Sequence, residues 1–258
     1  MGPKSIQGSQ ELAKRIKLRR NELNLTIEEA AAKAGVGTKT WSRYEAGESI
    51  RKDKCRGVCK ALSWHNFPEN ESGNNGMLNL GEYKHHEAWS QYLAKTYGIA
   101  EAASFVIGSD ILLDHVEEDM QALASKPRGT HIGEIGISFL EDLLPPQFLM
   151  RYDYDFLYAL RTKINSLRTT AHLGNPIIAH SVLEELTLYL IVEESRFLME
   201  SIELNDESSD EYCDNQWDQW IFDIFDDMDL LTWLYSDIYL DNDNVYHFDH
   251  WLKRQFYC

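Results

Sequence analysis

Polar residues between positions 38 and 43 are spaced so that they could bind the edges of nucleic-acid bases. A helix over this segment would place four of them on one face: Thr38, Lys39, Ser42 and Arg43. That face would offer hydroxyl groups, an ammonium group and a guanidinium group. Arg and Lys side chains can donate to O6 and N7 of guanine in the major groove, and Thr can contact a thymine methyl group. The segment therefore predicts a helix that could read base edges.

The neighbouring residues predict how this helix is held. Thr26 and Glu29 have the spacing of a capping box, which satisfies the free N–H groups at the start of a helix. Alanines on that preceding helix would let another helix cross closely, and Gly35 can adopt the positive φ that often ends a helix. On the next helix Trp41 and Tyr44 lie three residues apart, so they form an apolar stripe opposite the polar face. Two helices joined by a tight turn are predicted.

These features together resemble a known family. Residues 10–62 are similar to the lambda-repressor-like, or XRE-family, DNA-binding domain, which has five helices, the second and third forming the helix-turn-helix motif. In that family an arginine late in the first helix pairs with a glutamate at the end of the recognition helix. Arg20 and Glu45 occupy those two places here. The resemblance covers about a fifth of the chain.

The resemblance also implies roles for individual residues. It places Thr38, Lys39 and Arg43 at base-facing positions. Three further residues fall where the family holds backbone phosphates: Thr26, Arg51 and Lys52. Many members have glutamine at the second position of helix two, where this chain has Ile27, which cannot donate or accept a hydrogen bond. Part of the usual contact set is therefore missing, and a weakened or altered operator preference is expected.

Charge divides the chain into two regions. Residues 1–65 contain 14 Lys and Arg against 7 Asp and Glu, whereas residues 66–258 contain 11 against 35. A basic region attracts phosphates and an acidic one is repelled by them, so a polyanion should meet the first region alone. Between them, residues 66–76 are polar and rich in Gly and Asn. We predict a helix-turn-helix domain over 1–65, a linker over 66–76 and an acidic helical domain over 77–258.

Apolar residues recur at three and four positions throughout the acidic region, which is typical of amphipathic helices. The whole chain is therefore predicted to be all-α. Pro176 suits a first helical turn, because its missing N–H would have no partner there. We expect helices over residues 82–97, 99–107, 109–125, 132–144, 153–166, 176–201, 217–239 and 245–256.

Other residues of metal-binding or catalytic type have simpler interpretations. Cys55 and Cys59 share a helix face but have no second Cys or His pair nearby in the basic region, so core packing is favoured. His180 and Glu184 could align as an imidazole–carboxylate pair, yet a third ligand is missing. The aspartates of residues 217–239 are explained by a solvated helix face, and residues 241–244 by a turn. We expect no catalytic residue, no metal and no cofactor.

The cysteine pattern and hydropathy bear on localisation. The four cysteines are widely and unevenly spaced, which does not indicate a disulfide framework. The most apolar window, residues 183–192, contains Glu184 and Glu185, so a membrane span is not expected. A cytoplasmic protein is predicted.

Three functional hypotheses follow. The first is a transcription regulator, a repressor, that binds double-stranded DNA as a homodimer held together by residues 77–258. The second is an antitoxin-like or phage-type protein whose acidic domain binds a protein partner. The third is a regulator whose helical body responds to a peptide or small ligand.

Overall fold

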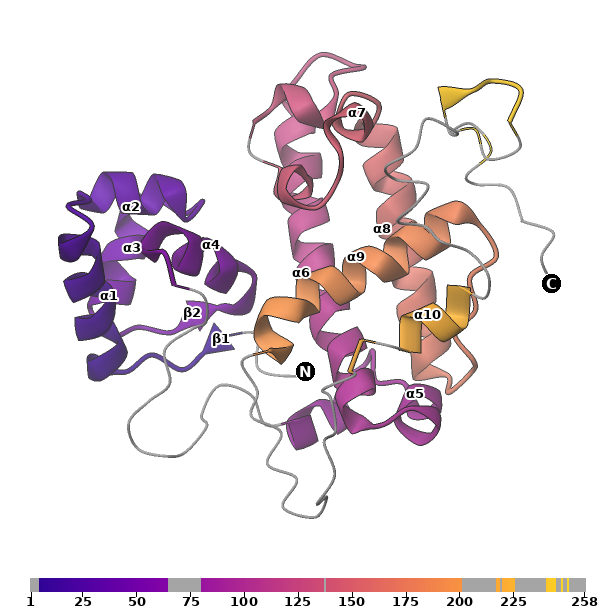
Figure 1. Cartoon of the computed structure of the whole chain (residues 1–258), viewed down its shortest axis with the longest axis horizontal. Helices are drawn as coiled ribbons and strands as arrows, with labels where there is room; N and C mark the ends of the chain where they lie inside the picture. Colours follow the sequence, from indigo (N-terminus) through magenta and orange to yellow (C-terminus); the bar gives the residue numbers. More distant parts are fainter. Residues whose placement is uncertain are drawn as a thin grey trace. The chain divides into compact units, whose positions relative to one another are not determined.

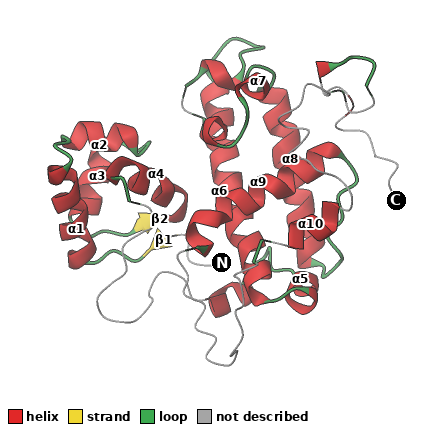
Figure 2. Ribbon diagram, viewed as in Figure 1, coloured by secondary structure: helices red, strands yellow, loops and turns green. Residues whose placement is uncertain are grey.

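The computed structural model describes residues 5–64, 80–136, 138–200, 217–218, 220–225, 240–244, 247 and 250. The chain divides into two compact units. The first comprises residues 1–86 and 197–214, and the second comprises residues 87–196 and 215–258. Nearly all the described elements are helices (Figure 2), which confirms the all-α prediction. The first unit extends beyond the predicted linker, residues 66–76, which lie outside the described residues.

The first unit contains four α-helices and two short strands among residues 5–64 (Figure 1). Its elements are β1 (Ser5–Ile6), α1 (Gln10–Glu22), α2 (Ile27–Lys33), α3 (Thr38–Glu45), β2 (Ile50–Arg51) and α4 (Lys52–Leu62). The two strands pair antiparallel, with Ile6 opposite Ile50. The expected fifth helix has no counterpart within this range. A six-residue 3₁₀ helix, η1 (Leu80–His85), follows in the same unit.

Local chemistry sets the ends of the helices in this unit. The hydroxyl of Ser9 accepts from the backbone N–H of Leu12 at 3.0 Å and caps α1. Thr26 and Glu29 form the predicted capping box at the start of α2. Gly35 ends α2 with φ +63°. The sequence therefore determines both helix starts and the turn between α2 and α3.

A close crossing of α2 and α4 organises the core of this unit. A Cβ atom at Gly57 would lie 2.3 Å from the carbonyl oxygen of Ala34, so only glycine allows this approach. The side chains of Ile16, Trp41 and Leu62 are fully buried around the crossing helices. Gly57 of α4 thus permits the close approach to α2, and α3 packs on α2.

The second unit is a bundle built around α6. Its helices are α5 (Gln91–Thr96), α6 (Ile99–Ala124), η2 (Ile132–Glu134), η3 (Phe139–Asp142), α7 (Pro146–Leu149), α8 (Tyr154–His172), α9 (Val182–Met199, to Arg196 within this unit) and α10 (Trp220–Phe225). α6 packs along α8, and Trp220 of α10 lies edge-on to Phe105 of α6. A guanidinium group on α8, that of Arg168, donates to Ser109 at 3.1 Å and to Glu87 at 3.0 Å.

Several predicted helix boundaries in this unit were wrong. The ranges 99–107 and 109–125 form one helix, α6, which continues through Gly108. A Cβ there would lie 1.8 Å from the carbonyl oxygen of Ile191, so this glycine permits α9 to cross rather than ending a helix. Within the range 132–144 the described helices are the 3₁₀ helices η2 and η3, and the range 82–97, which begins in the first unit, divides into η1 and α5. α9 begins at Val182, so Pro176 is not in its first turn.

Candidate nucleic-acid interface

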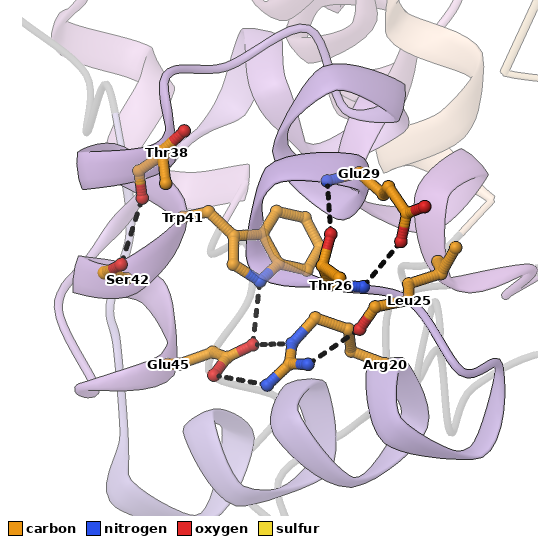
Figure 3. A network of polar contacts seen from close by, with 8 residues as sticks. All are labelled: Arg20, Leu25, Thr26, Glu29, Thr38, Trp41, Ser42 and Glu45. Carbon is orange, nitrogen blue, oxygen red and sulfur yellow. Dashed lines mark hydrogen bonds and ion pairs between the residues drawn. The ribbon is translucent and has the colours of Figure 1, made fainter.

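α3 has one buried face and one exposed face, as its sequence predicts. Trp41 is fully buried and Tyr44 is buried, which fixes the helix against the rest of the unit. The opposite side is exposed and carries all four predicted polar residues: Thr38, Lys39, Ser42 and Arg43. The hydroxyl of Ser42 donates to the carbonyl oxygen of Thr38 at 3.0 Å (Figure 3). The exposed face has the donors that base edges could accept.

A buried polar network attaches α3 to α1 (Figure 3). Arg20 donates from Nε to Glu45 Oε1 at 2.5 Å and from Nη2 to Oε2 at 3.2 Å. Trp41 donates from its indole N–H to the same carboxylate at 2.8 Å. The third guanidinium nitrogen of Arg20 donates to the carbonyl oxygen of Leu25 at 2.8 Å. The predicted pairing of Arg20 with Glu45 is therefore present, and Trp41 completes it.

The electrostatics of this network favour the ionised pair. Burial raises the pKa of Glu45, but the hydrogen bonds from Arg20 and Trp41, with the charge of Arg20, leave it below the ordinary value. The hydrogen bond to Glu45 raises the pKa of Arg20. Because both oxygens of Glu45 accept hydrogen bonds, from Arg20 and Trp41, the carboxylate can be buried at small cost.

The three candidate phosphate ligands lie in different environments. Thr26 is exposed at the start of α2, where its oxygen accepts the Glu29 N–H at 3.1 Å and its own hydroxyl hydrogen is not used by that bond. Arg51 is exposed and donates to Asp53 at 2.9 Å. Lys52 is only 7% exposed, and its Nζ donates to the hydroxyl of Tyr83 and lies 4.5 Å from the ring centroid.

The burial of Lys52 does not favour the phosphate contact predicted for it. A phosphate contact needs an exposed ammonium group, whereas this one is enclosed beside Tyr83 of η1. The resemblance to the family could not predict the burial of Lys52, because its partner Tyr83 lies 31 residues further along the chain. Thr26 and Arg51 keep the exposure that their predicted role requires.

Arg43 has a partner that the sequence reasoning missed. Its Nε donates to Glu48 Oε2 at 2.6 Å, and its Nη2 lies 2.5 Å from the same oxygen. Both side chains stay about half exposed, at 58% and 49%. The hydrogen bond and charge of Glu48 raise the pKa of Arg43, and Arg43 lowers the pKa of Glu48. A glycine just after the helix, Gly47, was the available signal for this contact.

Ile27 occupies the first position of α2 and is half-buried. Its hydrocarbon side chain supplies neither donor nor acceptor, so it cannot take the place of the glutamine found in many family members. The polar surface available beside α3 is correspondingly smaller.

The remaining candidate residues that the structure describes take part in packing, hydrogen bonds and turns. Cys55 and Cys59 are buried free thiols, and burial raises the pKa of Cys59 to about 12. Glu184 accepts from the backbone N–H of His180 at 2.6 Å and from Lys163 at 2.7 Å, so its carboxylate is already engaged. Residues 241–244 form the expected turn. Among the described residues no group of three or more His, Cys, Asp or Glu could hold a metal ion.

Most of the predicted aspartate-bearing helix, residues 226–239, and the helix predicted over 245–256 lie outside the described residues, apart from His247 and His250. Within the part of the chain that is described, no helix combines the length and apolarity needed to cross a membrane.

Comparison with known proteins agrees with the geometry of α2 and α3. Neither the curated proteins nor the solved structures contain a match to this chain. A family model described as a helix-turn-helix domain matches residues 11–62, from the second residue of α1 to the end of α4. The N-terminal part of the chain therefore contains a helix-turn-helix domain, a domain class that indicates nucleic-acid binding.

Proposed function

We propose that this protein is a sequence-specific DNA-binding transcription regulator of the XRE type that represses its target genes. One observation carries the proposal. The helix-turn-helix domain presents Thr38, Lys39 and Arg43 on the exposed face of α3, while Trp41 and Tyr44 anchor the opposite face. In this proposal α3 enters the major groove and these three residues contact base edges.

Thr26 and Arg51 supply phosphate contacts in this proposal. Both are exposed, and a hydroxyl donor and a guanidinium group are common ligands of phosphate oxygens. Such contacts fix the register of a domain on the duplex without reading its sequence. Lys52 takes no part in them, because its ammonium group is buried.

A dimer in the cytoplasm completes the proposal. One domain makes few base contacts, each worth about 1 to 3 kcal/mol, so specific affinity generally needs two half-sites about 10 base pairs apart. The excess of acidic over basic residues in 66–258, 35 against 11, disfavours DNA contact by that region. We assign dimerisation to its apolar helical surfaces. The buried free thiols of Cys55 and Cys59 agree with a reducing compartment. The chain has a binding role in this proposal and catalyses no reaction.

The test is selection of a binding site by the full chain from DNA duplexes with a randomised central segment. We expect an enriched sequence with two related halves. Arg43→Ala should lower the affinity for the selected duplex more than the affinity for a scrambled duplex, because it removes a base contact. Lys14→Ala removes an exposed cation from α1 and is the matched control, which should leave the ratio of the two affinities unchanged.

The same measurement can contradict the proposal. Failure to enrich any sequence at low ionic strength would show that the domain does not read DNA. Equal losses on the selected and scrambled duplexes for Arg43→Ala would remove Arg43 from the base-reading set and leave general DNA binding intact.

A further inference from the structure

The end of α3 places Glu48 beside Arg43 by backbone geometry. The N–H of Gly47 donates to the carbonyl oxygen of Tyr44 at 3.1 Å, and the N–H of Glu48 donates to that of Arg43 at 3.0 Å. Gly47 has φ +91°. These features define a Schellman motif, in which the residue after the glycine lies against the third residue from the helix end. That contact is usually hydrophobic, whereas here it is an ion pair.

The ion pair uses one edge of the Arg43 guanidinium group. Glu48 Oε2 lies between Nε and Nη2, at 2.6 Å and 2.5 Å. A guanidinium group is planar and has five N–H groups in a fixed arrangement. The contact therefore leaves the end formed by Nη1 and the outer N–H of Nη2 directed away from the carboxylate. Two parallel N–H groups at this end match O6 and N7 of a guanine.

We propose that Glu48 is a positioning residue that holds Arg43 for an end-on contact with guanine and thereby sharpens base discrimination by α3. This inference rests on the proposed function. Arginine without such a partner can donate through either edge and can also swing to a phosphate, so its contacts discriminate less between bases. Glu48 occupies the side edge and restricts the rotation of the side chain. The acidic residue beside the groove is thus a determinant of specificity.

A second interpretation of the same pair makes a different prediction. Glu48 carries a negative charge and about half of its side chain is exposed. If its effect were only to repel phosphates, its removal would strengthen binding to every duplex alike. If it withheld Arg43 from DNA, its removal would strengthen binding to the selected duplex most. Of these three effects, only the positioning of Arg43 predicts that removal of Glu48 weakens discrimination between the selected duplex and other duplexes.

The experiment compares variants of the full chain on two duplexes, the sequence selected by the wild type and a scrambled version. The readout is the dissociation constant for the scrambled duplex divided by that for the selected duplex, both measured at one salt concentration. A higher ratio means stronger discrimination. Glu48→Ala should lower this ratio by up to about fivefold, the range of coupling found for exposed ion pairs. Glu48→Gln should lower it less, because the amide oxygen can still accept from Arg43. Melting followed by circular dichroism checks that each variant is folded.

Two controls test whether the change in the ratio comes from the pair formed by Arg43 and Glu48. Glu22→Ala removes the acidic partner of another exposed pair, that with Arg19 at 3.0 Å on α1, and should leave the ratio unchanged. In the Arg43→Ala background, Glu48→Ala should cause no additional loss, because a positioning residue has no effect without the side chain that it positions.

Several outcomes would overturn the inference. An unchanged ratio with tighter binding to both duplexes would show a charge effect alone, and an increased ratio would show that Glu48 restrains Arg43. An Arg43→Ala variant with the wild-type ratio would show that Arg43 reads no base, although the domain still binds DNA. A wild type that selects no sequence would refute the proposed function and this inference with it.

Discussion

Glu45 is the polar residue on which the orientation of α3 most depends, through the hydrogen bonds of its carboxylate. It accepts three N–H groups, two from Arg20 and one from Trp41, and so connects α1 with α3. A charged group can be buried when its hydrogen bonds are satisfied in this way. The sequence predicted the Arg20 contact from the family resemblance, whereas the Trp41 contact follows from helical spacing, because Trp41 precedes Glu45 by four residues.

Neighbouring cations on either side of the β2–α4 junction should differ in their effect on DNA binding. Each neutralised phosphate changes the slope of log K against log salt concentration by about 0.9. Arg51→Met should therefore reduce the magnitude of that slope by about 0.9, because Arg51 is exposed and can reach a phosphate. Lys52→Met should leave the slope unchanged, because its ammonium group is enclosed beside Tyr83. Binding titrations over a range of salt concentrations measure both.

The pair Arg51 and Lys52 also shows what sequence can and cannot predict about the site. Periodicity predicts the exposure of Thr38 and Lys39 correctly, since a helix of known register has a known face. It cannot predict that Lys52 is buried, because the contacting ring of Tyr83 comes from a distant segment. A reduced salt slope for Lys52→Met would show that its amine reaches DNA after all.

The spacing of α2 and α4 in the first unit depends on Gly57. At the α2–α4 crossing, the Gly57 Cα lies so close to the backbone of Ala34 that an added Cβ would collide with a carbonyl oxygen at 2.3 Å. A carbonyl cannot move away as a flexible side chain can. The crossing therefore depends on the absence of a side chain, and α3, which packs on α2, depends on the crossing.

Gly57→Ala should lower the free energy of unfolding of the first unit by about 2 to 3 kcal/mol, because the two helices must separate. At an unobstructed helix position the same change would be stabilising by up to about 1 kcal/mol. Gly35→Ala is the comparison: nothing lies near its Cβ, so only its positive φ opposes the change, at about 1 to 2 kcal/mol. Urea denaturation followed by circular dichroism measures both variants.

The helix boundaries of the second unit show again that sequence periodicity does not predict contacts between distant elements. Amphipathic periodicity correctly predicts that residues 153–166 are helical, although α8 continues to His172. It places a break at Gly108, where the helix is continuous and the glycine accommodates α9. A sequence pattern indicates which residues favour a helix, but the need for a small residue at a crossing depends on an element more than 80 positions away.

At the scale of the whole molecule, the response to pH should differ from that of an ordinary acidic protein. Asp119 of α6 is buried, and its carboxylate accepts a hydrogen bond from Ser138. The pKa of Asp119 is raised to about 6, chiefly by burial and to a smaller extent by Glu118 and Glu141, against the lowering effects of Ser138 and His115. The folded protein therefore holds this proton more tightly than the unfolded chain does.

The raised pKa of Asp119 determines the direction in which the stability of the fold changes with pH. The stabilisation from protonated Asp119 is complete below about pH 4 and is lost as the pH rises through about 6. The shift corresponds to a loss on the order of 3 kcal/mol. Asp119→Asn cannot ionise, so it should melt at a higher temperature than the wild type at pH 7 and at a similar temperature at pH 4. Calorimetric melting across this range measures the difference.

Glu117→Gln is the control for that measurement, because it removes an exposed carboxylate from the same helix. It should leave the pH profile unchanged. A profile of Asp119→Asn that runs parallel to that of the wild type would show that Asp119 does not carry the pH dependence.

The division of the chain was predicted from charge, since residues 1–65 are basic and the rest is acidic. Charge indicates which part can approach DNA, but it does not indicate where a folded unit ends. The structure assigns residues up to His86 to the first unit, beyond the change in charge. Packing determines that boundary, and packing is not visible in composition.

The enclosed amine of Lys52 has a practical consequence for isolating the DNA-binding half of this protein. Its hydrogen bond to Tyr83 makes η1 a structural part of that half rather than an appendage. A fragment that stops at residue 65 would lose the phenol, and with it a hydrogen-bond partner of Lys52 and part of the surface that covers its ammonium group. Any truncation meant to preserve the native helix-turn-helix should therefore extend at least through His86.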